Sequence, residues 1–260
     1  MKKIIFLLSA TAFFAACSNT KNATSSNKPS TTEELNAAND AKQMMQAGND
    51  FYANGNAPVN WRMEIDFENK ITFTSDDGLA LSFATNTLQK TQAGNKTTYT
   101  GKITAGDISI AMEDGTCTVP TIRKVYQKLV TVTINQKAYT GCGSYLVNDN
   151  LEGKWNLEKI GTAPITAADY NKVPSFTFDL AQKRISGNDG CNSIGGSIDV
   201  QGSKIKFSGM LSTKMACVKG KNIESIINTS ISNKVADYYF KEGKLYLYLI
   251  DDTLLVFTRG

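Results

Sequence analysis

The sequence contains no histidine among its 260 residues. Histidine has the side-chain pKa nearest neutrality, and it is the usual general base and a common metal ligand. Its absence excludes hydrolases of the Ser-His-Asp and Cys-His types, and zinc sites with histidine ligands. Enzymes that work with carboxylates, lysine or tyrosine stay open, but an enzyme is the least favoured class. We expect no catalytic residues, cofactor or metal.

An excess of one charge sign is also missing. The formal net charge is +4, and it falls by two if Lys2 and Lys3 are removed with a leader segment. A nucleic-acid-binding protein needs a basic face, whereas the lysines here are scattered along the chain. The composition therefore predicts no nucleic-acid partner.

The apolar run near the start is too short for a comfortable membrane span. Two lysines, an apolar run and then small residues fill residues 1–16, which predicts a secretory signal peptide. Ala15-Ala16-Cys17 resembles a bacterial lipobox, which implies that Cys17 is lipidated and begins the mature protein. The alternative is an ordinary signal peptide in which this cysteine stands by chance.

The residues after Cys17 give the expected location. Ser18 stands where an aspartate would indicate retention in the inner membrane, so the outer membrane is favoured, with the lipid anchor as the membrane contact. The following residues lack the acidic cluster of a surface-export signal, which favours the periplasmic side over the cell surface.

Residues 17–48 are predicted to be a lipidated tether that ends in a weak helix. Residues 18–30 are almost all polar or small and cannot bury enough apolar surface to offset their ordering entropy. Thr31 to Glu34 is typical of a helix start, and Leu35, Met44 and Met45 could line a helix up to Gly48. Whether this helix docks on a domain stays open.

Residues 49–147 are predicted to form a β domain, most simply a small barrel or curled sheet. Trp61, Met63, Ile65 and Phe67 alternate with polar residues, as in a half-buried strand. The predicted strands are 61–67, 70–74, 79–83, 97–102, 107–113, 129–134 and 138–141. Asp76 and Asp77 could form an acid/base pair, but a turn is the favoured interpretation, because adjacent side chains there point apart.

Residues 148–260 are predicted to form a second antiparallel β domain with one amphipathic helix, Asn222 to Val235, whose isoleucines recur at helical spacing. The predicted strands are 155–160, 175–178, 184–186, 197–200, 204–207, 211–213, 237–241, 245–250 and 253–259. Four tyrosines of the last strands could stack on a ligand, but a packed face is favoured; they are Tyr238, Tyr239, Tyr246 and Tyr248. The fold class is mainly β, with helix added in the second domain.

Cysteines other than Cys17 number four, two in each predicted domain, and they allow three pairings. Pairing within each domain favours Cys117 with Cys142 and Cys191 with Cys217. Each bridge would close a loop of about 25 residues and contribute about 3 kcal/mol. The alternative, a four-cysteine metal site, lacks any CxxC pair.

Gly190-Cys191-Asn192 and Thr213 to Cys217 carry a resemblance to the META (HslJ-like) domain family. Residues 151–155, 176–178 and 254–257 extend it over the last two fifths of the chain. The resemblance implies a fold and an association with heat stress, but no catalytic residues. Residues 52–61, with Cys117 and 139–143, resemble an envelope lipoprotein domain of unknown function that accompanies META domains. Ala57 and Val59 replace that domain's usual acidic and aromatic pair.

These features predict a non-catalytic envelope lipoprotein that binds a protein partner or acts in stress, with its oligomeric state open. The alternative is an inhibitor of a lysozyme or protease. As an inhibitor, the protein would present the glycine-rich corner at 185–198 to the enzyme as a rigid loop. The competing interpretation of this corner is a turn whose polar residues form the turn's own hydrogen bonds. The candidate binding residues in that corner are Asn188, Asp189, Asn192 and Ser193.

Overall fold

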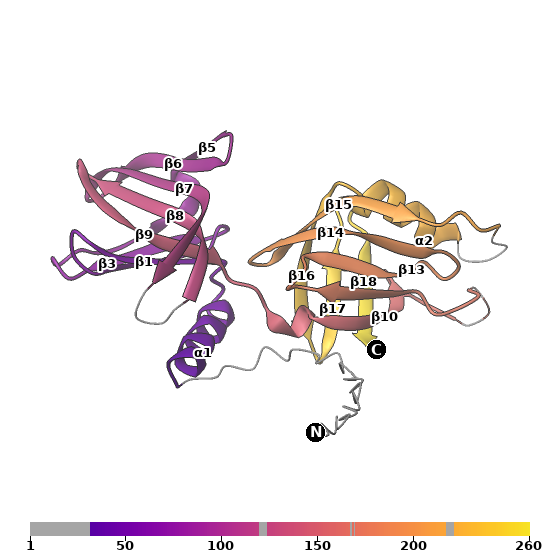
Figure 1. Cartoon of the computed structure of the whole chain (residues 1–260). Coiled ribbons are helices and arrows are strands. Elements are labelled where there is room, and N and C mark those ends of the chain that lie inside the picture. Colours follow the sequence, from indigo (N-terminus) through magenta and orange to yellow (C-terminus); the bar gives the residue numbers. More distant parts are fainter. Residues whose placement is uncertain (1–31, 120–123, 167, 169, 217–220) are drawn as a thin grey trace, which may run out of the picture.

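The computed structural model describes residues 32–119, 124–166, 168, 170–216 and 221–260. Within them, helix α1 (Thr32–Gln46) precedes two β domains that are joined by a short linker (Figure 1). The predicted signal peptide, Cys17 and the tether up to residue 31 lie outside the described residues. The architecture confirms a mainly β protein built from two small antiparallel sheets.

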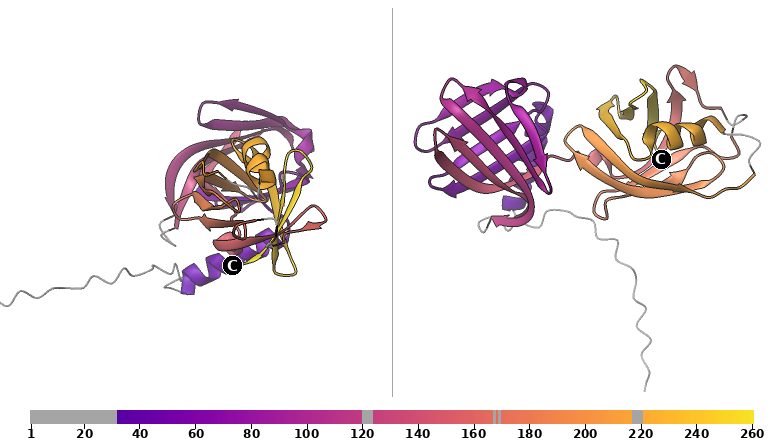
Figure 2. Two further views of the ribbon diagram at one scale, coloured as in Figure 1. Left: turned by 90° about the vertical axis from the view of Figure 1, so that its right-hand side faces the viewer. Right: turned by 90° about the horizontal axis from the view of Figure 1, so that it is seen from above.

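The first domain, in the described residues, is a nine-stranded antiparallel sheet curled into a half-barrel (Figure 2). Its strands are β1 (Phe51–Ala57), β2 (Trp61–Ile65), β3 (Lys70–Ser75), β4 (Ala80–Ala84), β5 (Gln89–Ala93), β6 (Lys96–Ile103), β7 (Gly106–Val119), β8 (Lys124–Ile134) and β9 (Lys137–Tyr145). Their order is β4-β3-β2-β1-β9-β8-β7-β6-β5. The 3-10 helix η1 (Thr85–Thr87) connects the two edge strands, β4 and β5.

Side-chain alternation decides which face of this sheet is buried. Trp61 and Met63 of β2 are at most 3% exposed, whereas Arg62 between them faces outward. The Trp61 Nε1–H donates to the backbone oxygen of Thr140 at 3.0 Å. A Cβ on Gly55 would come within 2.2 Å of that same oxygen, so only glycine permits the close approach of β1 and β9 there.

The second domain is a barrel that eight strands close within the described residues. They are β10 (Gly153–Ile160), β12 (Ser175–Asp179), β13 (Arg184–Asn188), β14 (Ser193–Gln201), β15 (Lys204–Ser212), β16 (Val235–Lys241), β17 (Lys244–Tyr248) and β18 (Leu254–Arg259). Pairing of β10 with β18 as well as β12 closes the ring, and β11 (Ala163–Pro164) adds a short pair to β10. The 3-10 helix η2 (Asp149–Leu151) leads into β10.

The predicted helix of this domain is present but ends earlier than the sequence indicated. It consists of α2 (Lys221–Ile226) and a π-helical turn, η3 (Ile227–Ile231). Ile223, Ile227 and Ile231 are buried against the barrel core, as predicted. Val235 is 45% exposed and begins β16, because Asn233 adopts a left-handed φ of 58° and Val235 pairs with Lys206.

Three strands of the described residues were not among the predicted ones: β1, β5 and the two-residue β11. All five residues of β5 are exposed, so this strand has no hydrophobic pattern to recognise. In β1 the buried alternation covers only Phe51 and Ala53, before Gly55 and a shift of register against β9. The segment 211–213, predicted as a separate strand, is largely the end of β15.

Cys117 and Cys142 form a disulfide with a Cα–Cα distance of 5.6 Å, which confirms this predicted pair. The bond connects β7 to β9 across β8. Cys191 is also disulfide-bonded, and its predicted partner, Cys217, lies outside the described residues.

Candidate functional site

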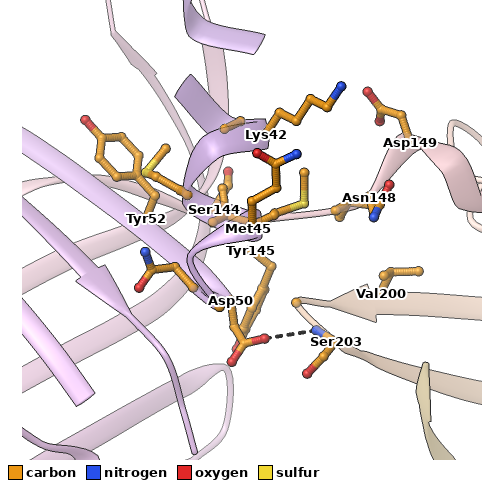
Figure 3. A pocket seen from close by; sticks show the side chains of 18 of the residues that line it. Lys42, Met45, Asp50, Tyr52, Ser144, Tyr145, Asn148, Asp149, Val200 and Ser203 are labelled. Carbon is orange, nitrogen blue, oxygen red and sulfur yellow. Dashed lines mark hydrogen bonds between the residues drawn. The ribbon is translucent and has the colours of Figure 1, made fainter. Parts of the chain in front are cut away.

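A cleft of about 1320 Å³ lies between the two domains (Figure 3). Its walls on the side of the first domain are α1, β1 and the ends of β8 and β9. The linker 146–150, the β14–β15 hairpin and β16 form the other walls. Concave surfaces at domain interfaces are common ligand sites, so this cleft is the candidate site of the protein.

Asp50 connects the two domains at the floor of the cleft (Figure 3). It is 7% exposed and directly precedes β1. Its Oδ1 accepts a hydrogen bond from the backbone N–H of Ser203 at 2.9 Å, and its Oδ2 accepts one from the N–H of Phe67 at 3.0 Å. Gly202 has a φ of 62°, and a Cβ there would come within 2.2 Å of Asp50 Oδ1. The tip of the β14–β15 hairpin is therefore fitted to this carboxylate.

Two further polar contacts join the domains. The Lys204 ammonium lies 3.2 Å from Glu68 Oε1 and also pairs with Asp237. The Lys183 ammonium donates to Gln127 Oε1 at 3.3 Å and lies 3.1 Å from Asp199. Because these side chains are well exposed, each pair contributes at most about 1 kcal/mol.

Helix α1 is docked on the first domain and forms one wall of the cleft (Figure 3). Met44 is 8% exposed, and just beyond the helix Asn49 Nδ2 donates to Glu64 Oε2 at 2.9 Å. The burial of Met44 shows that the end of α1 packs against the protein, and the hydrogen bond of Asn49 fixes the segment that follows the helix. The predicted contribution of Leu35 cannot be compared, since its side chain lies outside the described part of the chain.

Tyrosine hydroxyls with raised pKa values line the cleft. Burial is the main cause, and it raises the pKa of Tyr126 and of Tyr238 to about 12. Burial also raises the pKa of Tyr52 and of Tyr145. The carboxylate of Asp50 adds to the rise at Tyr145 and Tyr238. Tyrosine hydroxyls are protonated at neutral pH even at their ordinary pKa of about 10, and the raised values extend this to higher pH, so these hydroxyls can donate hydrogen bonds.

The candidate binding corner of the sequence lies elsewhere, at the turn between β13 and β14. Asp189 and Asn192 are each 1% exposed, so neither side chain is available to a partner. Asp189 Oδ1 accepts from the N–H groups of Cys191 at 2.9 Å and Asn192 at 2.6 Å. Asn192 Oδ1 accepts from the N–H of Met215 at 2.8 Å. Both side chains serve hydrogen bonds of the corner itself, as the turn interpretation of the sequence expects.

The other two residues of that corner have smaller roles. Asn188 Nδ2 donates to Ser175 Oγ at 2.8 Å, and its Oδ1 accepts from the N–H of Gly190 at 2.9 Å. Ser193 is exposed, and its backbone N–H donates to Thr213 Oγ1 at 3.1 Å. None of the four lines the interdomain cleft.

Asp76 and Asp77 face different partners. Asp76 accepts from Asn60 Nδ2 at 2.7 Å, whereas Asp77 pairs with Lys137 and accepts from the Tyr139 hydroxyl at 2.8 Å. Hydrogen bonds, above all the one from Lys137, hold the pKa of Asp77 well below its usual range. An anionic Asp77 beside a protonated Lys137 stabilises a turn and leaves no acid/base pair there.

The tyrosines of β16 and β17 are divided between the two faces of the barrel. Tyr238 is 5% exposed and belongs to the core, as the packed-face interpretation predicted. Tyr239 and Tyr248 are 46% and 42% exposed on the outside, which corrects that interpretation for them. The rings of Tyr239 and Tyr246 stack on each other at 4.7 Å.

The sequence analysis did not predict the cleft. Its residues come from α1, from both sheets and from the linker, and no local pattern shows that they meet. The short apolar pattern that includes Met44 and Met45 predicted a helix in this region, but it did not show where the helix lies.

The fold and the cleft define a two-domain β protein with an interdomain pocket. Residues 149–260 match the family model of the META domain, which confirms the resemblance of the C-terminal part. The family is consistent with an envelope module of undefined molecular activity.

Several solved structures are similar to parts of the chain at low sequence identity. Two NMR structures, the second of a protein from Burkholderia xenovorans, are similar to 42% of this chain at 20% and 22% identity, both with a TM-score of 0.36. They are covered over 93% and 82% of their own length. A crystal structure of a double mutant of the vaccine antigen Transferrin Binding Protein B from Haemophilus parasuis is similar to 76% of this chain at 10% identity, with 52% of its own length covered and a TM-score of 0.24. No curated protein matches the chain.

The described residues show neither a membrane-spanning helix nor a cluster of metal-ligand side chains. None of the helices there has the length and apolar character needed to cross a membrane. In the same residues, no group of three acidic or cysteine side chains is placed to hold a metal ion.

Proposed function

We propose that this protein is a non-catalytic binding module of the cell envelope and that the interdomain cleft is its binding site. The observation that carries the proposal is the 1320 Å³ cleft itself, whose walls belong to both domains. A binding surface made by two domains can hold a partner more firmly when the domains are fixed to each other, as they are here through Asp50. The absence of histidine from the sequence and the META resemblance support a binding role over a catalytic one.

Site-directed photo-crosslinking in cells tests the binding site. Val125 and Leu129 are both on β8, and their side chains are 58% and 46% exposed. Val125 lines the cleft and Leu129 does not. A photo-reactive amino acid at position 125 should therefore capture a partner that the same residue at position 129 does not capture. Equal capture at the two positions, or capture at position 129 alone, would reject the cleft as the binding site.

The proposal includes a lipid anchor at Cys17 in the outer membrane, facing the periplasm. The pattern of residues 1–17 supports it. Mass analysis of the native protein should show a chain that begins at Cys17 and carries acyl groups, and Cys17→Ser should prevent acylation and release the protein from the membrane fraction. An uncleaved start, or a mature chain without acyl groups, would overturn the anchor.

A further inference from the structure

The charged groups of the cleft are strongly unequal in sign. Its carboxylates are Asp40, Asp50, Asp66, Glu68, Asp149 and Asp199, and its basic side chains are Lys42, Arg62 and Lys183. The chain as a whole carries a formal charge of +4, so negative charge is concentrated in this cleft against the overall sign. Low-dielectric walls around charges of one sign focus the electrostatic field inside a cleft.

Ion pairs cancel charges of both signs in the cleft and leave, within the described residues, four unpaired carboxylates and Lys42. Arg62 is bound by Glu64, Lys183 is bound by Asp199, and Glu68 is bound by Lys204. Within the described residues, Asp40, Asp50, Asp66 and Asp149 form no ion pair with a basic side chain. The charges of Asp50 and Asp66 are stabilised by N–H groups, which leave them negative.

The neutral groups of the cleft also suit a ligand that donates hydrogen bonds. The Asn54 side-chain oxygen is buried and has no donor among the described residues. Arg62 already lies over the Tyr52 ring, with its guanidinium carbon 5.8 Å from the ring centroid. This contact shows that the tyrosine lining can hold a cation over a ring face. Asp40 and Asp149 also raise the pKa of the cleft residues Tyr52 and Tyr238, although burial is the larger cause.

We propose that the cleft binds a ligand with several amino groups, held by the unpaired carboxylates, the Asn54 oxygen and the tyrosine rings. This inference rests on the proposed binding role of the cleft. The same chemistry is found in linear polyamines and in lysine-rich peptide segments, and a binding experiment can separate the two sources.

Calorimetric titration of the full-length protein with four probes tests the inference: spermine, pentalysine, pentaglutamate and the neutral sugar chitotetraose. Spermine or pentalysine should bind, and binding should weaken as salt concentration rises. Binding of spermine alone identifies a polyamine, and binding of pentalysine alone identifies a peptide. No binding of either cation, or stronger binding of pentaglutamate or the sugar, would overturn the inference.

A pair of double variants places the binding in the cleft. Asp40→Asn with Asp149→Asn should weaken cation binding on the order of tenfold. Asp107→Asn with Glu113→Gln removes the same charge from exposed positions of β7 outside the cleft and should change the affinity less than twofold. Equal weakening by both pairs would show non-specific attraction and reject the site. The crosslinking at Val125 would still test the binding role of the cleft independently.

Discussion

Asp50 and Ser203 are 153 residues apart in the chain and are joined by a hydrogen bond of 2.9 Å between the carboxylate and a backbone N–H. The same carboxylate accepts from Phe67 in its own domain. One buried side chain therefore fixes both the start of β1 in the first domain and the position of the second domain. The shape of the cleft depends on this residue.

Asp50→Ala should loosen the connection between the domains. Hydrogen bonds to a charged acceptor contribute about 1.5–3 kcal/mol, so the free energy of unfolding should fall by about that amount. Small-angle X-ray scattering should also show a larger radius of gyration, because the Ser203 N–H loses its acceptor.

Asp66→Ala is the matched control for that variant. Asp66 is 8% exposed, and among the described residues its carboxylate accepts from Glu68 and Asn69, both in the same domain. It should lower stability while leaving the radius of gyration unchanged. A radius that increases equally in both variants would contradict the role given to Asp50.

Gly202→Ala should disturb the same joint from the other side. The new Cβ would come within 2.2 Å of Asp50 Oδ1, in addition to the cost of about 1 kcal/mol for a left-handed alanine. Gly243→Ala is the control, since Gly243 has a similar φ of 73° and open space around it. Thermal denaturation should show the larger loss for Gly202→Ala, and equal losses would indicate that the hairpin tip shifts without cost.

Removing the Cys117–Cys142 disulfide should destabilise the first domain. A closed loop of 25 residues corresponds to about 3 kcal/mol of unfolded-state entropy. Cys117→Ser, Cys142→Ser and the double variant should each lower the Tm of this domain by roughly 12–24 °C. Differential scanning calorimetry would measure the change. Each single variant already breaks the bond, so a double variant much less stable than either single one would contradict the disulfide as the cause of the loss.

Local patterns were sufficient for most of the fold. The alternation at Trp61, Met63 and Ile65 predicted β2 because burial on one face of a sheet requires that period. The cysteine spacing predicted the pair Cys117–Cys142 because both residues belong to one domain. The isoleucine spacing predicted the helix, but its end depends on the pairing of Val235 with Lys206, which is a tertiary contact.

The site could not be predicted in this way. Asp189 and Asn192 have the polarity of binding residues, but their burial follows from the turn that they themselves form. Asp50 has no distinguishing local pattern, and its role depends on Ser203 in another domain. An interdomain site depends on how the two domains pack against each other, and local sequence patterns do not show this packing.

Asp77 should make stability depend on pH in the acidic range. Lys137, Ser75 and Tyr139 donate to its carboxylate and hold its folded-state pKa well below the unfolded value of about 3.9. A lowered pKa adds stability that is fully present above the unfolded pKa and is lost as pH falls through the folded pKa.

Asp77→Asn should therefore be less stable than the unmodified protein at pH 7, and the difference should shrink below about pH 4. The neighbouring Asp76→Asn is the control and should show little such dependence, because the Asp76 carboxylate accepts from Asn60 Nδ2 at 2.7 Å and pairs with no basic side chain of the described residues. Urea unfolding between pH 7 and pH 3 measures both variants, and a difference for Asp77→Asn that stays constant down to pH 3 would show that its carboxylate adds no pH-dependent stability in that range.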